Sequence, residues 1–189
     1  MKRIQSIAAL ALFSATAFLG GCASGPAIPF TRGSANLDTV PEADLRAVAE
    51  SIEAAVRAGE TEPRIANHGA IVADFPALQQ AVRSRALRNN LIDRFLESGH
   101  AYETDNGLVA VLRTKEYKSE GSSQDRDRDA LLVMSENNNR WTIYEGIVEN
   151  SKLPARALAS VQEIFRQVRQ ANLKPGQKFQ APGSEITVK

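Results

Sequence analysis

The residues in this chain best suited to acid–base chemistry are its two histidines, His68 and His100, and each stands beside a glycine. Imidazole gains and loses a proton near neutral pH, so a histidine near a carboxylate and a hydroxyl can support proton transfer or activate a nucleophile. Ser98, His100 and Glu103 are close enough along the chain to form such a triplet. Triplets of this kind arise easily by chance. We therefore expect both histidines to be solvated loop residues and the chain to have no catalytic residues.

Metal and cofactor chemistry has no support in the sequence pattern. A zinc site uses three or four Cys, His or carboxylate ligands at short spacings, and no cluster of this kind is present. The chain also lacks a nucleophile-elbow motif, a Walker-type glycine loop and a dinucleotide-binding glycine motif. We therefore expect no metal and no cofactor.

The single cysteine, Cys22, follows an N-terminal segment with the features of a secretory signal peptide. Lys2 and Arg3 precede the apolar run Ile7–Leu19, which is shorter than the about 20 residues that a membrane-spanning helix needs. A basic start followed by a short apolar run is typical of a signal peptide. We therefore expect residues 1–21 to be a signal peptide; the alternative is a buried N-terminal helix.

The stretch Leu19-Gly20-Gly21-Cys22 resembles the lipobox of bacterial lipoproteins. The resemblance implies that the Cys22 sulfur receives a diacylglyceryl group and that the chain is cut just before it. Acylation of the new amino terminus would complete a stable membrane anchor, since anchoring takes two or more acyl chains. The next residue, Ala23, is not aspartate, which implies sorting to the outer membrane with the domain on its periplasmic face. The alternative is an incidental cysteine in an ordinary secreted protein.

The charge balance argues against a nucleic-acid partner. The net charge of the chain is +1, and removal of Lys2 and Arg3 with the leader makes it −1. A protein that binds nucleic acid or an anionic membrane surface through charge alone shows a basic excess. After Cys22, the Gly-, Pro-, Ser- and Ala-rich stretch 22–36 is expected to be a lipidated, flexible tether.

The rest of the chain predicts a mainly α fold with small β-hairpins, an α+β class, in one domain. Apolar residues recur at helical spacing in four segments, which we expect to form a helical core: residues 40–58, 75–97, 128–150 and 154–172. Two hairpins are expected, with turns at Asn106-Gly107 and Pro182-Gly183. We divide this part into an N-terminal helix and loop at 37–73 and a domain at 74–189.

Some finer features are also expected. Thr39, with Glu42 three residues later, is expected to cap the first helix, and Asp74 the second. Residues 115–129 are polar and are expected to form a mobile loop that tightens into the start of a helix near Asp125–Asp129.

The helix at 75–97 is expected to bury one face and to solvate the other. Its apolar face is expected to comprise Leu78, Val82, Leu87, Leu91, Phe95 and Leu96. Its four arginines are expected to lie on the solvated surface: Arg83, Arg85, Arg88 and Arg94.

Asn137 is the most informative polar residue because it falls four residues after Val133 and four before Trp141, inside an apolar stripe. A buried amide without partners costs about 1–3 kcal/mol. We therefore expect Asn137 to bond to a backbone turn or to a neighbouring polar side chain.

Three segments together resemble the YdbL-like family of small bacterial envelope proteins: Gly99–Val111, Val133–Ile147 and Pro175–Gly183. The resemblance covers a little over half of the chain, roughly residues 82–188. The chain departs from the family pattern at Tyr102, where a glycine is usual, and near Ile186, where a tryptophan is usual. The positions that the pattern marks are Glu103, Asp105, Asn106, Gly107, Asn137, Arg140 and Tyr144.

The residue chemistry favours structural roles for these positions. Glu103 can accept a charge-assisted hydrogen bond from Arg140. We hypothesise that Asn137 and Arg140 clamp the Glu103–Gly107 hairpin onto the third helix.

The family resemblance implies an accessory role beside an AsmA-like, lipid-carrying envelope protein. We therefore expect a non-catalytic interaction module at the outer membrane, with an envelope protein as partner. The alternatives are a lipid-binding carrier or chaperone, which would need an apolar groove, and a cell-wall hydrolase, which would need a cleft joining His100 to carboxylates.

Overall fold

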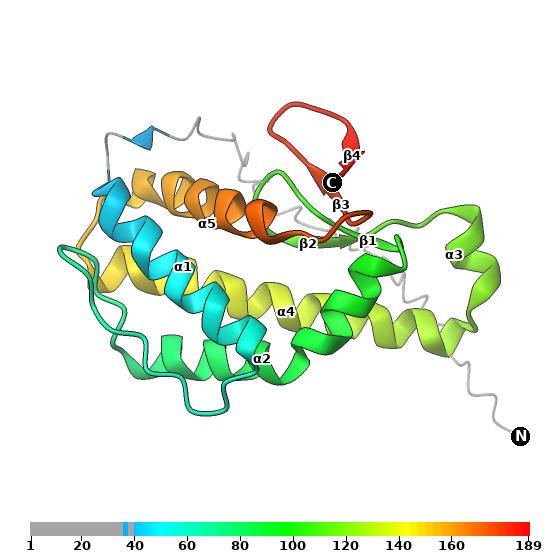
Figure 1. The fold of residues 1–189 in the computed structure, drawn as a ribbon, viewed down its shortest axis with the longest axis horizontal. Coiled ribbons are helices and arrows are strands. Elements are labelled where there is room, and N and C mark those ends of the chain that lie inside the picture. The colour runs from blue at the N-terminus through cyan, green and yellow to red at the C-terminus, as the bar shows by residue number, and fades with distance from the viewer. Residues whose placement is uncertain (1–35, 38–39) are drawn as a thin grey trace, which may run out of the picture. The chain divides into compact units, whose positions relative to one another are not determined.

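The computed structural model describes residues 36–37 and 40–189, and within them the fold is α+β and mainly helical, as the sequence predicts. The described residues form four long helices, one short helix and four short strands, whose arrangement is drawn in Figure 1. The helices are α1 (Glu42–Ala58), α2 (Pro76–Glu97), α3 (Lys115–Glu120), α4 (Ser123–Asn150) and α5 (Leu158–Asn172), with the 3-10 turn η2 (Ala155–Ala157) before α5. The strands are β1 (Ala101–Glu103), β2 (Val109–Val111), β3 (Lys178–Gln180) and β4 (Ile186–Val188).

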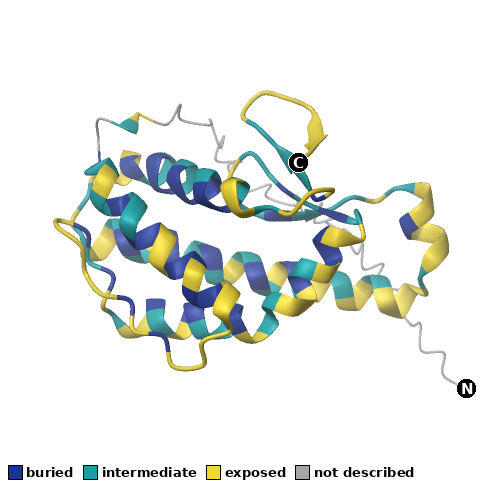
Figure 2. Cartoon of the chain, viewed as in Figure 1, coloured by how far each residue is buried: buried dark blue, intermediate teal, exposed yellow. Residues whose placement is uncertain are grey.

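The four long helices share one hydrophobic core. Helix α1 packs on α2 and α5, and α2 packs along α4. Figure 2 shows the buried residues gathered on the facing sides of these helices. Among the largest fully buried apolar side chains are Leu45 and Ile52 of α1, Leu78 of α2, Tyr144 of α4 and Phe165 of α5. Helix α1 therefore belongs to the same folded unit as the helices that follow it.

The two expected hairpins join into one sheet of order β2-β1-β3-β4. The pairs β1–β2 and β3–β4 are antiparallel, and β1 pairs in parallel with β3 through Glu103 and Phe179. The turn of the first hairpin is wider than the Asn-Gly step suggests. Gly107 has a positive φ of +76°, whereas Asn106 does not. The loop is closed by the Thr104 side chain, which accepts from the Leu108 amide at 3.1 Å.

The expectation of a mobile loop in the first part of 115–129 is wrong, because Lys115–Glu120 forms α3. The expected helix start near Asp125–Asp129 is close to the observed start of α4 at Ser123. Thr114 caps α3 by accepting from the Tyr117 amide at 3.2 Å. Ser122 and Asp125 form a capping box at the start of α4. Tyr117 is buried and its hydroxyl donates to Asp129 at 3.0 Å, so a single aromatic side chain holds the polar segment in place.

The cap of the second helix also differs from expectation. Helix α1 begins at Glu42 after Pro41, and its expected cap, Thr39, lies outside the described residues. Helix α2 begins at Pro76 after Phe75, and Asp74 does not cap it. Instead, Asn67 Oδ1 accepts from the Asp74 amide at 2.8 Å, while proline at the first position has no amide hydrogen that needs a partner.

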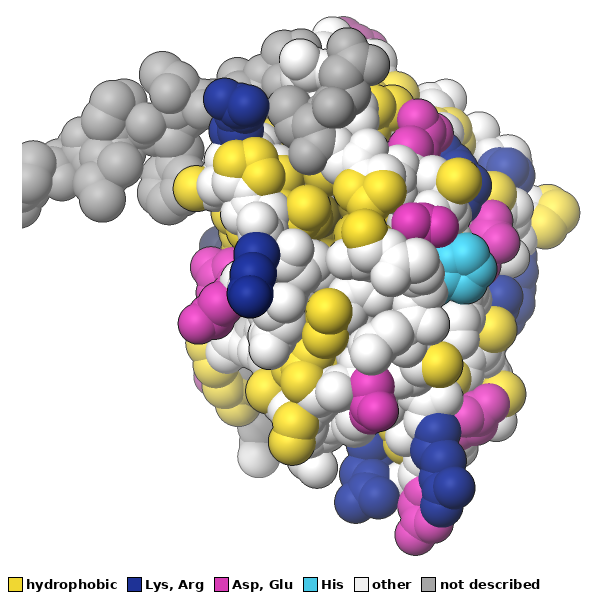
Figure 3. Space-filling view, turned by 90° about the vertical axis from the view of Figure 1, so that its left-hand side faces the viewer, with side chains coloured by type: hydrophobic (Ala, Val, Ile, Leu, Met, Phe, Trp, Pro, Cys, Tyr) yellow, Lys and Arg dark blue, Asp and Glu magenta, His cyan; other side chains and the backbone are white. Residues whose placement is uncertain are grey.

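None of the described helices is long and apolar enough to cross a membrane. The signal peptide, Cys22 and the tether that precedes Asn36 lie outside the described residues. On the face drawn in Figure 3, acidic and basic side chains are interspersed with apolar and other polar ones, and neither charge forms a large patch.

Candidate functional site

Six buried charged side chains meet in the interior, and the main elements of the fold each supply at least one. They are three glutamates and three arginines, each between 2% and 6% exposed. The members are Glu53 of α1, Arg85 of α2, Glu103 of β1, Glu136 and Arg140 of α4, and Arg169 of α5. We call this set the arginine–glutamate cycle.

The cycle is closed and alternates in charge. On one side, Arg85 binds Glu53 through two bonds of 3.0 Å and donates from Nε to Glu136 at 2.8 Å. On the other side, Arg140 donates from Nε to the same Glu136 oxygen at 2.8 Å. Arg140 also binds Glu103 through two bonds, of 2.7 and 2.8 Å.

Arg169 of α5 closes the cycle, because it donates to Glu103 at 3.2 Å and to Glu53 at 2.9 Å. Paired, planar bonds of the kind that Arg85 and Arg140 form are the strong form of the arginine–carboxylate interaction.

The carbonyl oxygen of Gly107 connects the first hairpin to the cycle. It accepts from Arg169 Nη2 at 2.7 Å, from the Tyr144 hydroxyl at 2.7 Å and from Arg140 Nη1 at 3.3 Å. A side chain at Gly107 would place its Cβ 3.0 Å from Arg169 Nη2 and 3.1 Å from the Gln162 carbonyl oxygen. Glycine is therefore required here both by its positive φ and by the closeness of α5.

The electrostatics of the cycle favour the charged forms. Burial acts to raise the pKa of Glu53, but the attraction of Arg85 and Arg169 outweighs it and lowers the pKa to about 2. The same balance, with Arg85 and Arg140 as partners, lowers the pKa of Glu136 to about 2. Burial alone would lower the pKa of Arg140, but Glu103 and Glu136 raise it well above its ordinary value.

This arrangement joins secondary-structure elements and is poorly suited to proton transfer. A carboxylate with a pKa of about 2 is a weak general base near neutral pH. A cavity of about 60 Å³ borders the cycle and also touches Gln177, and a polar cavity of this size has room for water. The Gln177 amide nitrogen is buried without a protein partner, so it is available to hold a water molecule.

The structure brings together most of the residues marked by the family pattern. The expected bonds between Glu103 and Arg140 are confirmed, and Tyr144 and Gly107 belong to the same network. The expectation for Asn137 is also confirmed: its side chain accepts from the Val109 amide and donates to the Val109 carbonyl, both at 2.9 Å.

The other two marked residues, Asp105 and Asn106, lie at the outer part of the turn. The Asn106 carbonyl oxygen accepts from Gln162 of α5 at 3.1 Å. The Asn106 side chain is exposed and accepts from the Thr104 hydroxyl.

Sequence reasoning missed four members of the cycle and placed one of them wrongly. Arg85 is not on a solvated surface but is 2% exposed. It follows the buried Val82 by three residues and Ala81 by four, which is a signal of the inward face. The other three missed residues also follow a buried apolar residue by one helical turn. Glu53 follows Ala49 by four residues, Glu136 follows Val133 by three, and Arg169 follows Phe165 by four.

The two histidines do not join the cycle. His68 is exposed, as expected, and contacts Asp44 at 3.1 Å. His100 is more enclosed than expected, with 18% of its side chain exposed, because its ring packs on Tyr117. Its Nε2 lies 2.7 Å from Glu120 rather than near Glu103, so the triplet considered from the sequence does not form.

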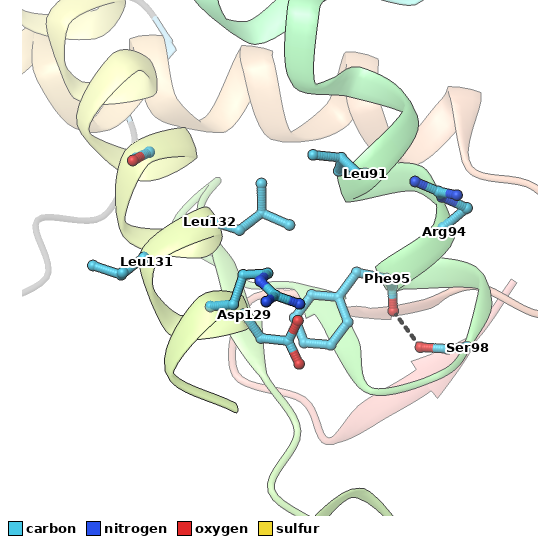
Figure 4. A pocket seen from close by; sticks show the side chains of 9 residues that line it. Leu91, Arg94, Phe95, Ser98, Asp129, Leu131 and Leu132 are labelled. Carbon is cyan, nitrogen blue, oxygen red and sulfur yellow. Dashed lines mark hydrogen bonds between the residues drawn. The ribbon is translucent and has the colours of Figure 1, made fainter. Parts of the chain in front are cut away.

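A second feature is an apolar groove of about 480 Å³ between α2 and α4. Figure 4 shows Leu91 and Phe95 of α2 facing Leu132 of α4 across it, with Arg94 at its edge. Ser98, Arg128, Asp129, Leu131 and Ser135 complete the lining. The groove is separate from the cavity beside the cycle, because no residue lines both.

Two residues expected in the buried face of α2 are exposed, and one of them, Leu91, lines this groove. Leu87 is 66% exposed and Leu91 is 45% exposed. Helix α4 packs against Arg85 rather than against these leucines, so the buried face of α2 is rotated away from them. The apolar pattern predicted a helix correctly but assigned too broad a face to the core.

Comparisons with known proteins give no match to a family model, a curated protein or a solved structure. Among the described residues, no group of three or more His, Cys, Asp or Glu side chains is arranged to hold a metal ion.

Proposed function

We propose that this chain is a bacterial envelope lipoprotein, anchored through Cys22 at the periplasmic face of the outer membrane, whose domain is a non-catalytic binding module. The family resemblance suggests an envelope protein as its partner, in an AsmA-like lipid-transport or envelope-maintenance system. The anchor would keep the domain at the membrane, and its helical surface would contact the partner.

The observation that best supports a binding module over an enzyme is the arginine–glutamate cycle. Its carboxylates are the most deeply buried acidic groups among the described residues, and each accepts at least two bonds from guanidinium nitrogens. Groups that neutralise one another in this way stabilise a fixed arrangement of helices. A hydrolase would need a carboxylate or histidine free to act on a substrate in a cleft.

The anchor is tested by mass spectrometry of the mature protein. We expect an N-terminus at Cys22 that carries a diacylglyceryl group and an amide-linked acyl chain. A Cys22→Ser variant should lose the lipid, and an Ala23→Asp variant should move from outer-membrane to inner-membrane fractions. A mature Cys22 with a free thiol, or an uncut leader in the cytosol, contradicts the proposal.

The binding role is tested by affinity purification from detergent-solubilised membranes with the anchored protein as bait. We expect a stoichiometric envelope protein and no turnover of cell-wall fragments by the purified bait. Turnover of such a fragment without any specific partner would instead support the hydrolase.

The groove between α2 and α4 favours a second candidate function, that of a lipid carrier. Most of its lining is apolar, so an acyl chain in the groove would contact apolar side chains along one side and water along the other. Native mass spectrometry of gently extracted protein tests this function, because a carrier should retain one stoichiometric phospholipid in addition to the anchor.

A further inference from the structure

An exposed apolar strip lies on α2 and α4, and two of its four residues, Leu91 and Leu131, line the groove between these helices. Among the described residues, six large apolar side chains are exposed, and four of them lie on these two helices. We call these four the α2–α4 strip: Leu87, Leu91, Leu131 and Met134, which are 45% to 66% exposed. An apolar surface concentrated on one helix pair is typical of an interaction site.

Arginines lie at the ends of the strip. On α2, Arg83 precedes Leu87 by four residues and Arg94 follows Leu91 by three, so these residues share one helix face. On α4, Arg128 precedes Leu131 by three residues. The two helices run in opposite directions, because Arg85 bonds Glu136 at 2.8 Å whereas Arg88, further along α2, reaches the carbonyl of the preceding residue of α4, Ser135, at 3.4 Å. Arg94 and Arg128 therefore lie near one end of the strip and Arg83 near the other.

These flanking arginines are largely available to a partner. Arg94 donates only to the Asn90 carbonyl of its own helix. Arg128 has 73% of its side chain exposed and one long contact of 3.4 Å with Asp125. The structure gives Arg83 no ion pair among the described residues. Two arginines, Arg94 and Arg128, line the groove, and its one carboxylate, Asp129, accepts a bond from Tyr117. The groove lining therefore carries more positive than negative charge, while the exposed Asp127 lies four residues before Leu131.

The charge and openness of the strip favour one kind of occupant. A second copy of this chain would bring arginines against arginines, which disfavours self-association. An acyl chain would stay partly in water, because Leu91 and Leu131 are about half exposed on the sides of the groove. Two neighbouring helices with a groove between them instead match a third helix, whose apolar side chains pack between theirs. From Leu87 of the strip to Ser98 at the end of the groove, this surface extends about 16 Å, or three helical turns.

We propose that the α2–α4 strip binds an amphipathic helix of a partner protein. Its apolar stripe lies in the groove, and its Asp or Glu side chains pair with Arg83, Arg94 and Arg128. This inference rests on the proposed role as a binding module and identifies the surface and the chemistry of the partner.

The test measures binding of two labelled synthetic helices to the detergent-solubilised mature lipoprotein by fluorescence anisotropy. The two 18-residue peptides share one leucine stripe, and one carries glutamates beside it where the other carries lysines. We expect the glutamate peptide to bind at least tenfold more tightly. Arg94→Glu with Arg128→Glu should reverse the preference, and Leu91→Gln with Leu131→Gln should weaken both peptides at least tenfold. Arg156→Glu, an exposed charge reversal outside the strip, should change neither.

Circular dichroism and the melting temperature of each variant show whether it folds. If the Leu91→Gln, Leu131→Gln variant unfolds, the Arg94→Glu, Arg128→Glu variant, whose substitutions lie at the surface, still tests whether the strip prefers an acidic helix.

Several outcomes overturn the inference. These are equal binding of the two peptides, no binding of either, dimers in sedimentation that Leu131→Gln abolishes, or binding of phosphatidylglycerol vesicles that the leucine variant abolishes. A lipidated protein whose natural partner still binds after Leu91→Gln with Leu131→Gln would overturn this inference and leave the proposed function intact.

Discussion

At Gly107, a single carbonyl oxygen receives hydrogen bonds from side chains of two helices. Arg140 and Tyr144 come from α4, and Arg169 comes from α5. Two of these donors, Arg140 and Arg169, are already oriented by their bonds in the cycle. To reach Arg169, the backbone of the turn must lie close to α5. This explains why an ordinary hairpin glycine has a structural role beyond the turn itself.

A substitution of Gly107 separates the cost of the backbone conformation from the cost of crowding. Gly107→Ala should destabilise the domain by about 2–4 kcal/mol, because it adds a contact with Arg169 and the Gln162 carbonyl to the about 1–2 kcal/mol of a left-handed residue. Gly183→Ala is the matched control, with φ +71° and no atom near the added carbon. It should cost only about 1–2 kcal/mol in urea unfolding. Equal losses would show that the closeness of α5 at Gly107 has no energetic effect.

Reversal of the charge at Arg140 tests the cycle. Arg140→Glu places a third carboxylate against Glu103 and Glu136, and removal of one partner from a buried pair alone costs about 3–5 kcal/mol. We expect an unfolded or strongly loosened domain by circular dichroism and thermal melting. Arg156→Glu, an exposed reversal, should change stability by less than about 0.5 kcal/mol. An Arg140→Glu melting temperature equal to that of the parent would refute the clamp.

At the scale of the elements, Asn137 shows what helical spacing can reveal. Its place inside an apolar stripe predicted a hydrogen-bonded amide, and the structure supplies the Val109 backbone as its partner. Helical spacing also places Arg85 on the inward face. Spacing alone cannot show that Glu53 and Glu136 are there to form hydrogen bonds with it. Burial of a charge depends on partners from distant segments, so the sequence predicted the helices well and the cycle only in part.

The prediction of a mobile loop after Lys115 was wrong for a related reason. The low content of apolar residues in the segment 115–129 suggested a mobile loop, yet one buried aromatic residue and two side-chain caps are enough to fix it. Local capping stabilises a helix end by about 1 kcal/mol, and Tyr117 adds contacts with Phe95 and His100. The average composition of a segment does not reveal helix caps or the burial of a single aromatic residue.

The contact of α4 with β2 can be tested through Asn137. Asn137→Ala should cost about 1–3 kcal/mol, because it leaves the Val109 amide and carbonyl without their side-chain partner. Hydrogen exchange at the Val109 amide should accelerate more than exchange in α1. Asn138→Ala, on the exposed side of the same helix turn, should leave both quantities nearly unchanged. Unaltered exchange at Val109 in the first variant would show that the bond does not hold the hairpin.

At the scale of the whole molecule, the arginine–glutamate cycle couples α1, α2, β1, α4 and α5. A buried ion pair is not by itself a strong source of stability, because both charges must leave water. The closed cycle does, however, raise the free energy of alternative packings of the helices. A shift of any one helix by a turn would separate its charge from two opposite charges and leave buried groups unpaired. We infer that the cycle selects one packing of the helices, and that the α2–α4 strip is held on a rigid support.

The cycle also determines how the stability of the whole domain responds to acid. The unfolded chain titrates its glutamates near pH 4.5, whereas Glu53 and Glu136 have pKa values of about 2 in the folded state. Glu103 also has a lowered pKa, because Arg140 and Arg169 outweigh the effect of burial. The stability from these groups is therefore complete above pH 4.5 and is lost as the pH falls towards 2.

Urea unfolding across pH should show nearly constant stability above pH 5 and a fall of about 3 kcal/mol per pH unit between pH 4 and pH 2.5, since at least two protons bind on unfolding. Glu136→Gln removes one of these titrating groups and should reduce that slope by about one third to one half. Glu145→Gln, on the exposed side of the same helix, should leave it unchanged. A loss of stability centred near pH 6, or equal slopes in both variants, would mean that groups outside the cycle govern the acid response. The buried charges would then select the fold without setting the pH range in which it is stable.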